Sequence, residues 1–270
     1  MAEAMLDVFA RRKDRFRMLE EGTYAAGWRG GELKLLEVGC AAGDAAAHLV
    51  STLPVTVTGV DQDPELIARA AEKYAALSER CRFICADARA LPFRNGSFDG
   101  AYSEAAFSVI PDKEAAAREY ARVLRPGGRL LINDFCARSE PDPELRAQVS
   151  KIPCFAGVQT IPEYERILRG AGLGLVSADE DYSEFMRIIL HVSREYGVGP
   201  GETGGYLAQT FGSAPADSGF FKSARMSYCQ LILEKPEQKS AGFCRKMGEN
   251  RYFFVYFPKH LYIFFTRRCA

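Results

Sequence analysis

An acidic residue and two glycines lie close together near the start of the chain, where an apolar segment runs into a turn. Glu37 ends the apolar segment, and Gly39 and Gly43 lie in the turn before an alanine-rich segment. Glycines let the backbone come close to a ligand, and the free N–H groups of a helix start point toward it. A carboxylate there suits a ligand that carries an ammonium group or hydroxyls. The spacing predicts a ligand-binding turn between a strand and a helix.

Two common phosphate-binding patterns do not fit this turn. A dinucleotide fingerprint needs glycine at its first, third and sixth positions, where this chain has Gly39, Ala41 and Asp44. A P-loop ends in Gly-Lys-Ser/Thr, whereas Asp44 and Ala45 follow Gly43. Ala41 also adds a methyl group, which disfavours positive φ. The predicted ligand is therefore one whose phosphates do not press on the loop.

Carboxylates also follow the next two strand-like segments. Asp61 ends the second segment and Asp87 follows the third. In open α/β sheets a ligand lies at the carboxyl ends of the strands, where Asp61 can accept hydrogen bonds from ribose hydroxyls and Asp87 from an adenine amine. The alternatives are an acidic helix start for Asp61, a role that Asp63 fits better, and a surface turn for Asp87. Together these positions favour an adenosine ligand.

Strand-like and helix-like segments alternate along most of the chain, with short connections. This alternation predicts a parallel sheet that is covered by helices on both faces. The expected strands are 33–38, 55–60, 82–86, 98–103, 129–134, one that starts at 172–176, and 227–234. The expected helices are 44–52, 64–77, 112–124, 161–170 and 182–196, and 197–205 is expected to break the chain.

Taken together, these motifs resemble those of class I S-adenosylmethionine (SAM) dependent methyltransferases that act on small molecules, such as enzymes of ubiquinone and menaquinone biosynthesis. The resemblance rests on Glu37 to Gly43, Val60-Asp61, Ala86-Asp87-Ala88, Leu91-Pro92-Phe93, Phe98-Asp99 and Arg122 to Gly128, in that order. It covers 33–134 well and extends loosely to 234. It implies a Rossmann-like α/β fold, a doubly wound sheet of seven mostly parallel strands with helices on both faces and an antiparallel last strand.

The resemblance also implies roles for single residues. Glu37 and the turn would hold the methionine part of SAM, Asp61 the ribose, and Asp87 the adenine. The expected cofactor-binding residues are Glu37, Gly39, Cys40, Ala41, Gly43, Asp61, Gln62, Asp87, Ala88 and Ser103. Ser103 and Glu104 would line the floor near the transferred methyl, with Glu104 as the candidate catalytic base. Methyl transfer is an in-line displacement, so positioning supplies most of the rate and only some nucleophiles need a base.

Composition narrows the range of partners. Lys and Arg total 35, as do Asp and Glu, among 270 residues, so no overall positive field favours nucleic acid. Ser-Glu-Ala-Ala follows the fourth strand, where nucleic-acid methyltransferases would carry an Asn/Asp-Pro-Pro-Tyr/Phe motif. No apolar run approaches the roughly 20 residues that span a bilayer. The expected partner is a small-molecule methyl acceptor, with no nucleic acid and no integral membrane segment.

The eight cysteines are scattered and form no Cys-x-x-Cys pair. They predict free thiols in the cytoplasm and no metal site. One alternative is an arsenite or thiol methyltransferase, because Cys154 and the residues after it resemble a segment in which a cysteine of arsenite methyltransferases binds arsenic. That chemistry needs several thiolates at one centre, and neither Cys40 nor Cys136 is an evident partner. A second alternative is a non-catalytic, regulatory SAM-binding protein of the same fold.

The predicted organisation has three parts. Residues 1–32 form an N-terminal helical segment, and 33–236 form the methyltransferase domain, with a helical lid inserted at about 138–223. Residues 237–270 form a C-terminal aromatic hairpin or tail, because 251–257 and 261–266 are almost wholly aromatic or β-branched. The hairpin is expected to pack on the domain or on a second subunit, giving a homodimer. A membrane-surface patch or a poorly ordered tail are the alternatives.

Overall fold

The structure is a computed structural model that describes residues 7–140, 142–148, 152, 155, 157–210, 223–237, 252–257 and 260–265. After helical residues 7–10, the elements in chain order are α2 (Arg17–Ala25), β1 (Leu33–Val38), α3 (Asp44–Thr52), β2 (Val55–Asp61), α4 (Pro64–Lys73), η1 (Ala75–Leu77), β3 (Cys81–Cys85), β4 (Phe98–Glu104), η2 (Phe107–Val109), α5 (Lys113–Val123), β5 (Leu124–Ala137), α6 (Pro143–Gln148), β6 (Gln159–Thr160), α7 (Ile161–Gly170), β7 (Gly174–Glu180), α8 (Tyr182–Tyr196), α9 (Thr203–Thr210), β8 (Met226–Glu234), β9 (Tyr252–Phe257) and β10 (His260–Phe265). The chain divides into two units, Met1–Pro236 and Glu237–Ala270.

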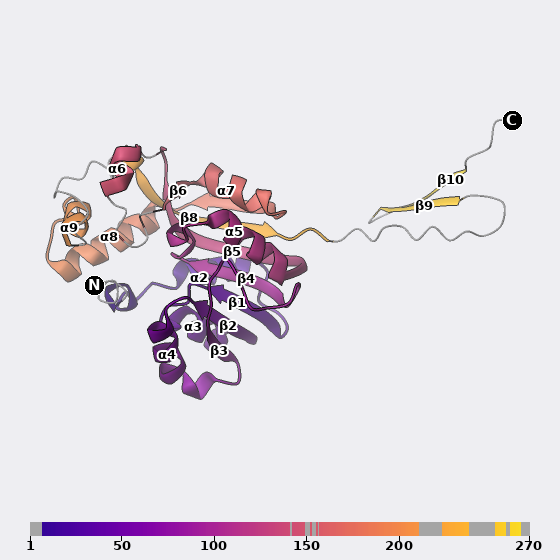
Figure 1. Cartoon of the computed structure of the whole chain (residues 1–270), viewed down its shortest axis with the longest axis horizontal. Helices are drawn as coiled ribbons and strands as arrows, with labels where there is room; N and C mark the ends of the chain where they lie inside the picture. The colour runs from indigo at the N-terminus through magenta and orange to yellow at the C-terminus, as the bar shows by residue number, and fades with distance from the viewer. Residues whose placement is uncertain are drawn as a thin grey trace. The chain divides into compact units, whose positions relative to one another are not determined.

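The first unit contains a mixed sheet with strand order β3-β2-β1-β4-β5-β8-β7, and the short β6 pairs with β5 (Figure 1). Strands β1 to β5 run parallel to one another. The last strand, β8, is antiparallel to both β5 and β7. These pairings confirm the predicted fold class. Strand order reverses between β1 and β4, which is where an open α/β sheet binds its ligand.

Adjacent side chains of the central strands point to opposite faces of the sheet, and each face has its own core. Leu35 packs in a cluster with α2 and α3, through residues such as Leu19 and Leu49. Leu36 belongs to a second cluster that contains residues of α5 and α7, including Tyr120. The period of two in a strand explains why neighbouring leucines serve different layers. Helices therefore cover both faces, as predicted.

Several element bounds coincide with those expected from the sequence. Helices α3, α7 and α8 have the predicted limits. Asp63 accepts hydrogen bonds from the N–H groups of Glu65 and Leu66 at the start of α4, the capping role that its position predicts. Strand β5 is longer than expected, because it begins at Leu124, with a register shift opposite β4, and continues to Ala137. The expected break at 197–205 is shorter, since Gly197 ends α8 with φ +66° and α9 begins at Thr203.

The interval 138–223 holds more than helices. Within it, β7 pairs with β8 and α7 packs against α5, so both belong to the layers of the sheet. Helix α8 contacts β8 and carries residues that line a cavity of about 430 Å³. Of the described residues in this interval, those of α8 are therefore best placed to cover a ligand.

The second unit contains an antiparallel hairpin. Strands β9 and β10 pair with Leu261 opposite Tyr256 and Phe264 opposite Phe253. The aromatic and β-branched pattern thus forms the two strands expected from it. Dimerisation through this hairpin stays a prediction.

Candidate active site

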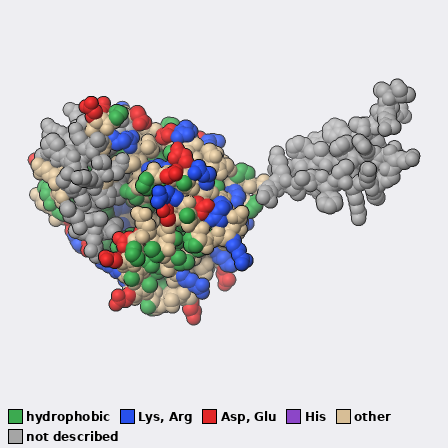
Figure 2. Space-filling model, viewed as in Figure 1, with side chains coloured by type: hydrophobic (Ala, Val, Ile, Leu, Met, Phe, Trp, Pro, Cys, Tyr) green, Lys and Arg blue, Asp and Glu red, His purple; other side chains and the backbone are tan. Residues whose placement is uncertain are grey.

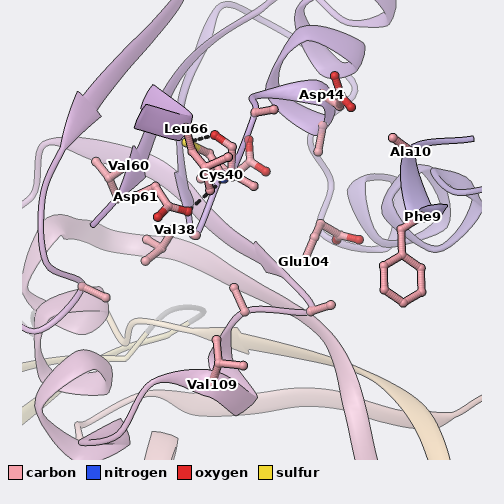
Figure 3. Close-up of a pocket in the computed structure, with 18 of the residues that line it drawn as sticks. Phe9, Ala10, Val38, Cys40, Asp44, Val60, Asp61, Leu66, Glu104 and Val109 are labelled. Carbon is pink, nitrogen blue, oxygen red and sulfur yellow. Dashed lines mark hydrogen bonds between the residues drawn. The ribbon is translucent and has the colours of Figure 1, made fainter. Parts of the chain in front are cut away.

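A cavity of about 430 Å³ lies at the carboxyl ends of the central strands (Figure 3). It brings together most of the residues predicted from the sequence: Glu37, Gly39, Cys40, Ala41, Asp61, Gln62, Asp87, Ala88 and Glu104. In Figure 3, Asp61 lies beside Cys40 and Val60, while Glu104 points toward the helix that carries Phe9. We call the part around Asp61 and Cys40 the cofactor half of the cavity. The part around Glu104 and Phe9 is the acceptor half.

The turn after β1 has an unusual backbone. Gly39, Ala41 and Gly43 have φ of +81°, +45° and +80°. Ala41 adopts positive φ although its methyl group disfavours this conformation. The Ala41 N–H donates to Asp61 Oδ2 at 2.9 Å, and this hydrogen bond helps to compensate for the backbone strain. A Cβ on Gly39 would lie 2.3 Å from that of Ala106, another residue of the cavity wall. Glycine at position 39 therefore keeps the cavity wall closely packed.

Two predicted residues lie outside the cavity lining. A Cβ on Gly43 would lie 2.5 Å from the ring of Phe83, so this glycine lets the turn pack on β3 rather than touch a ligand. Ser103 is fully buried, one position before Glu104 on β4. Because successive strand side chains point to opposite faces, only Glu104 of this pair lines the cavity. Gly43 and Ser103 thus have structural surroundings here.

The carboxylate of Asp61 both supports the turn and keeps capacity for a ligand. Its Oδ2 accepts from Ala41 N–H and its Oδ1 accepts from Asp63 N–H at 3.1 Å. A carboxylate oxygen accepts about two hydrogen bonds, so each oxygen can still accept one more. Two neighbouring hydroxyls of a ribose match this capacity.

Glu37 is 2% exposed, at the base of the cavity. The Tyr102 hydroxyl donates to its Oε2 at 3.2 Å. Burial, together with the charge of Glu104, raises the pKa of Glu37 well above its ordinary value. A ligand ammonium group in the cavity would offset this desolvation and favour the carboxylate form.

Asp87 has a different environment from Asp61. Arg89 donates to it through Nη2 at 2.6 Å and Nε at 3.0 Å, and the Arg89 N–H donates to it as well. These bonds hold the pKa of Asp87 at about 2. The side chain is 37% exposed, so this geometry matches the surface turn that the sequence left open. Ala88 lines the cavity beside it.

Glu104 is held by a chain of amides. Asn133 Nδ2 donates to Glu104 Oε1 at 2.6 Å, and Gln230 Nε2 donates to Asn133 Oδ1 at 2.9 Å. Burial raises the pKa of Glu104 to about 8, with the nearby carboxylates Asp134 and Glu184 adding to the rise. The side chain is half-buried and lines the cavity. It is thus an oriented carboxyl group that changes its protonation state at about pH 8.

Most of the acceptor half has no counterpart in the motifs of the sequence. Its apolar wall consists of Phe9, Met18, Phe135, Ile188 and Tyr228. Arg12 and Glu184 also line it, and they form an ion pair although 172 residues separate them. His191 Nε2 lies 2.7 Å from the Val8 carbonyl oxygen, which ties α8 to the N-terminal residues. Contacts between such distant segments leave no local pattern to read.

Thiol and metal chemistry find little support at this site. The described free cysteines are Cys40, Cys81, Cys85, Cys136 and Cys229, of which only Cys40 lines the cavity. Burial raises the pKa of the Cys40 thiol, which disfavours the thiolate. Within the described ranges, no cluster of three or more His, Cys, Asp or Glu side chains suits a metal ion. Cys154, on which the arsenic alternative depends, lies outside the described residues.

Among the described residues on the visible face of the first unit, acidic and basic side chains are interspersed, without a continuous patch of one sign (Figure 2). This distribution gives no extended track for a nucleic-acid backbone on that face. Over the part of the chain that the structure describes, none of the helices has the length and apolar character needed to cross a membrane.

Comparison with known proteins identifies the family. Residues 36–132 match the methyltransferase domain family. An O-methyltransferase of Pyrenophora dematioidea is 32% identical over 207 residues, which are 74% of each chain. The chain belongs to the class I SAM-dependent methyltransferases. The 27-O-demethylrifamycin SV methyltransferase of Amycolatopsis mediterranei is 36% identical over 57% of this chain and 58% of its own length. The chain thus spans about three fifths of that relative.

Solved structures agree on the fold of this methyltransferase chain. The cyclase SpnF superposes with a TM-score of 0.68 at 25% identity, covering 83% of this chain and 82% of its own. Phosphoethanolamine N-methyltransferase 2 of Haemonchus contortus, solved with SAM, gives a TM-score of 0.66 at 19% identity, over 82% of this chain and 52% of its own. The cofactor of the family is SAM. The residues of the cavity fit SAM, because Asp61 can accept further hydrogen bonds and the turn that begins at Gly39 lies against the cavity.

Proposed function

We propose that this protein transfers the methyl group of SAM to a hydroxyl oxygen of an apolar small molecule, with Glu104 as the general base. SAM, when bound, supplies a methyl group on a positively charged sulfur. The observation that supports this proposal is the position of Glu104. Asn133 orients its carboxyl group, and Glu104 lies in the same cavity as the cofactor residues, next to an apolar wall. Relatives named O-methyltransferases agree with an oxygen acceptor.

The cofactor half supplies binding. Asp61 would accept from the ribose hydroxyls, Glu37 would face the ammonium group, and the backbone of the turn would lie along the methionine part. Cys40, Gln62 and Ala88 would contribute contacts from the same wall. Asp87 already accepts hydrogen bonds from Arg89, so it would have to accept one from the adenine amine in addition to these. These interactions position the cofactor, and positioning supplies most of the rate of such a displacement.

The acceptor half supplies the base and excludes water. A base works best when its pKa lies near the working pH, and the pKa of Glu104 is about 8. Asn133 fixes the carboxylate by its 2.6 Å bond to Oε1, which leaves Oε2 to accept the proton of an acceptor hydroxyl. The aromatic residues Phe9, Phe135 and Tyr228 would enclose the apolar body of the acceptor.

The isosteric variant Glu104→Gln tests this proposal. Native protein and variant would be incubated with radiolabelled SAM and a panel of phenols, naphthols and aliphatic alcohols, and methyl transfer measured. We expect the variant to lose roughly 10²- to 10⁴-fold in kcat, as is usual for removal of a general base, and to keep its affinity for S-adenosylhomocysteine. A variant with native turnover would remove Glu104 from the chemistry.

The fold similarity to a cyclase supports one other function, ring closure of an apolar substrate in the same cavity without methyl transfer. Binding of S-adenosylhomocysteine with no methylation of any panel member would favour this function or a regulatory SAM-binding role. We further propose a reducing compartment such as the cytoplasm, which the free thiols support. A homodimer formed through β9 and β10 remains part of the proposal, and sedimentation of the full chain tests it.

A further inference from the structure

A buried arginine in the acceptor half has hydrogen-bonding capacity that the protein does not use. Arg12 lines the cavity and is 8% exposed. Its Nη2 donates to Glu184, and its Nε lies 3.2 Å from Asp14 Oδ1. Its Nη1 is buried and finds no partner among the described residues. An unpaired buried N–H of a cation loses its hydration without compensation, so an oxygen atom brought by a ligand would stabilise it.

The guanidinium is held in place before any ligand arrives. Glu184 is 1% exposed and also accepts from Arg17 Nη2 at 2.8 Å, and the Asp14 carbonyl accepts from Arg12 Nη2 at 3.3 Å. Asp181 receives a further bond from Arg17 at 2.6 Å. A donor fixed by such contacts loses little freedom when it binds an oxygen. Arg12 is therefore a preorganised donor.

The charges around Arg12 indicate which oxygen it would bind. Glu184 and Asp14 already face its positive charge. A full anion would meet these carboxylates, and like charges in a partly buried site are costly. A carbonyl or hydroxyl oxygen accepts a hydrogen bond without adding a charge. The surroundings thus favour a neutral oxygen.

We propose that Arg12 binds a second oxygen of the methyl acceptor, a carbonyl or a hydroxyl, while Glu104 faces the hydroxyl that is methylated. This inference rests on the proposed function and names its acceptor class, which is an apolar compound with two oxygen atoms, such as a dihydroxyarene. Arg12 is then an acceptor-binding residue that determines specificity. The aromatic wall holds the carbon skeleton between the two polar contacts.

The test compares 2-naphthol with 2,3- and 2,7-dihydroxynaphthalene as acceptors of methyl from SAM. We expect at least one diol to exceed 2-naphthol roughly ten- to a hundredfold in kcat/KM, the size expected for a hydrogen bond to a charged group. Arg12→Gln should bring this ratio close to one. Arg17→Gln is the matched control, because Arg17 pairs with the same Glu184 but does not line the cavity. It should keep the native ratio.

Arg12→Lys provides a second variant, in case Arg12→Gln does not fold. Lysine keeps a charge opposite Glu184 but lacks the forked second arm, so it should also lose the diol preference. Equal kcat/KM for all three compounds, or a preference that survives in the Arg12 variants, would overturn the inference. A weaker affinity of Arg12→Gln for S-adenosylhomocysteine, with the preference intact, would assign Arg12 to the cofactor instead and overturn it too.

Two further outcomes separate the inference from the proposed function. If none of the three naphthalene compounds is methylated or binds the protein loaded with S-adenosylhomocysteine, the acceptor class is wrong. Methyl transfer to another alcohol would then leave the proposed function standing. Failure of the native protein to bind S-adenosylhomocysteine at all would instead count against the proposed function itself.

Discussion

The two halves of the cavity are built in different ways. The cofactor half comes from three consecutive strand ends, and its geometry depends on backbone conformation at Gly39 and Ala41. The acceptor half joins the N-terminal residues to α8, β5 and β8, which are far apart in the chain. The first is a local arrangement that a short motif can specify. The second exists only after the chain has folded.

Their electrostatics differ in the same sense. The Asp87 side chain in the cofactor half is 37% exposed and paired with Arg89. In the acceptor half, Arg12 and Glu184 are both buried and form an ion pair. Removing one partner of a buried pair leaves an uncompensated charge, whereas an exposed pair contributes little. A substitution in the acceptor half can therefore change both ligand binding and the stability of the fold, so it needs a matched control.

The largest effect in the cofactor half is expected from Gly39→Ala. The new Cβ would overlap that of Ala106 and impose positive φ on alanine. Overpacking costs about 1–3 kcal/mol and left-handed backbone about 1–2 kcal/mol, so relief by movement of the turn would weaken SAM binding roughly a hundredfold. Calorimetric titration with S-adenosylhomocysteine measures this.

Gly172→Ala is the control for backbone strain alone. Gly172 also has positive φ, at +91°, but nothing lies within 4 Å of the position that a Cβ would take there. We expect this variant to lose stability without losing affinity. An equal loss of affinity in both variants would show that the close approach of Gly39 to Ala106 does not matter for binding.

The next effect is expected from Asp61→Ala, which should weaken SAM binding roughly ten- to a hundredfold through loss of charge-assisted hydrogen bonds worth about 1.5–3 kcal/mol. The substitution also removes the carboxylate to which the Ala41 N–H donates in the native protein. Asp63→Ala is the control, since it removes the cap of α4 and should cost about 1 kcal/mol of stability with native affinity. Native affinity of Asp61→Ala would exclude Asp61 from the cofactor site.

The sequence predicted the sheet and the cofactor half because both follow from local patterns. Alternating apolar segments predicted the strands, and the spacing of Glu37, Gly39 and Asp61 predicted where the ligand lies. It could not separate Gly43 from the lining residues, because a glycine needed for packing on Phe83 has the same letter as one that faces a ligand. Arg12 and Glu184 were missed because a buried pair between distant segments resembles ordinary surface charge in the sequence.

The raised pKa of Glu104 gives the acceptor half a pH dependence. If Glu104 is the base, kcat/KM should fall about tenfold for each pH unit below its pKa of about 8 and level off above it. The folded state also holds a proton between the ordinary value of 4.5 and about 8, where the unfolded chain does not. Stability should therefore fall as pH rises through this window.

Glu104→Gln should flatten that change of stability between pH 6 and pH 8. Asp134, whose raised pKa is about 6, contributes with the same sign at lower pH and is largely ionised in both states above it. Denaturant unfolding of both proteins at several pH values measures the difference. Parallel curves for the native protein and the variant would contradict the raised pKa of Glu104.

The smallest expected effect compares one alanine from each half. Ala41 and Ala105 both have positive φ, at +45° and +50°, which glycine adopts more easily. Ala41→Gly should stabilise the protein by about 1 kcal/mol, a rise in Tm of roughly 2–4 °C for a chain of this size, with native turnover.

Ala105→Gly should gain less, because the Ala105 methyl packs against the apolar cluster of the acceptor half. Loss of that methyl offsets about 0.8 kcal/mol of the relief. The variant also loosens the backbone next to Glu104, whose position the Ala105 N–H helps to fix by donating to the Asn133 carbonyl at 2.7 Å. We therefore expect lower turnover in Ala105→Gly than in Ala41→Gly. Equal stability gains with equal turnover would mean that the two halves tolerate backbone change alike, because Glu104 would then not depend on its neighbouring backbone.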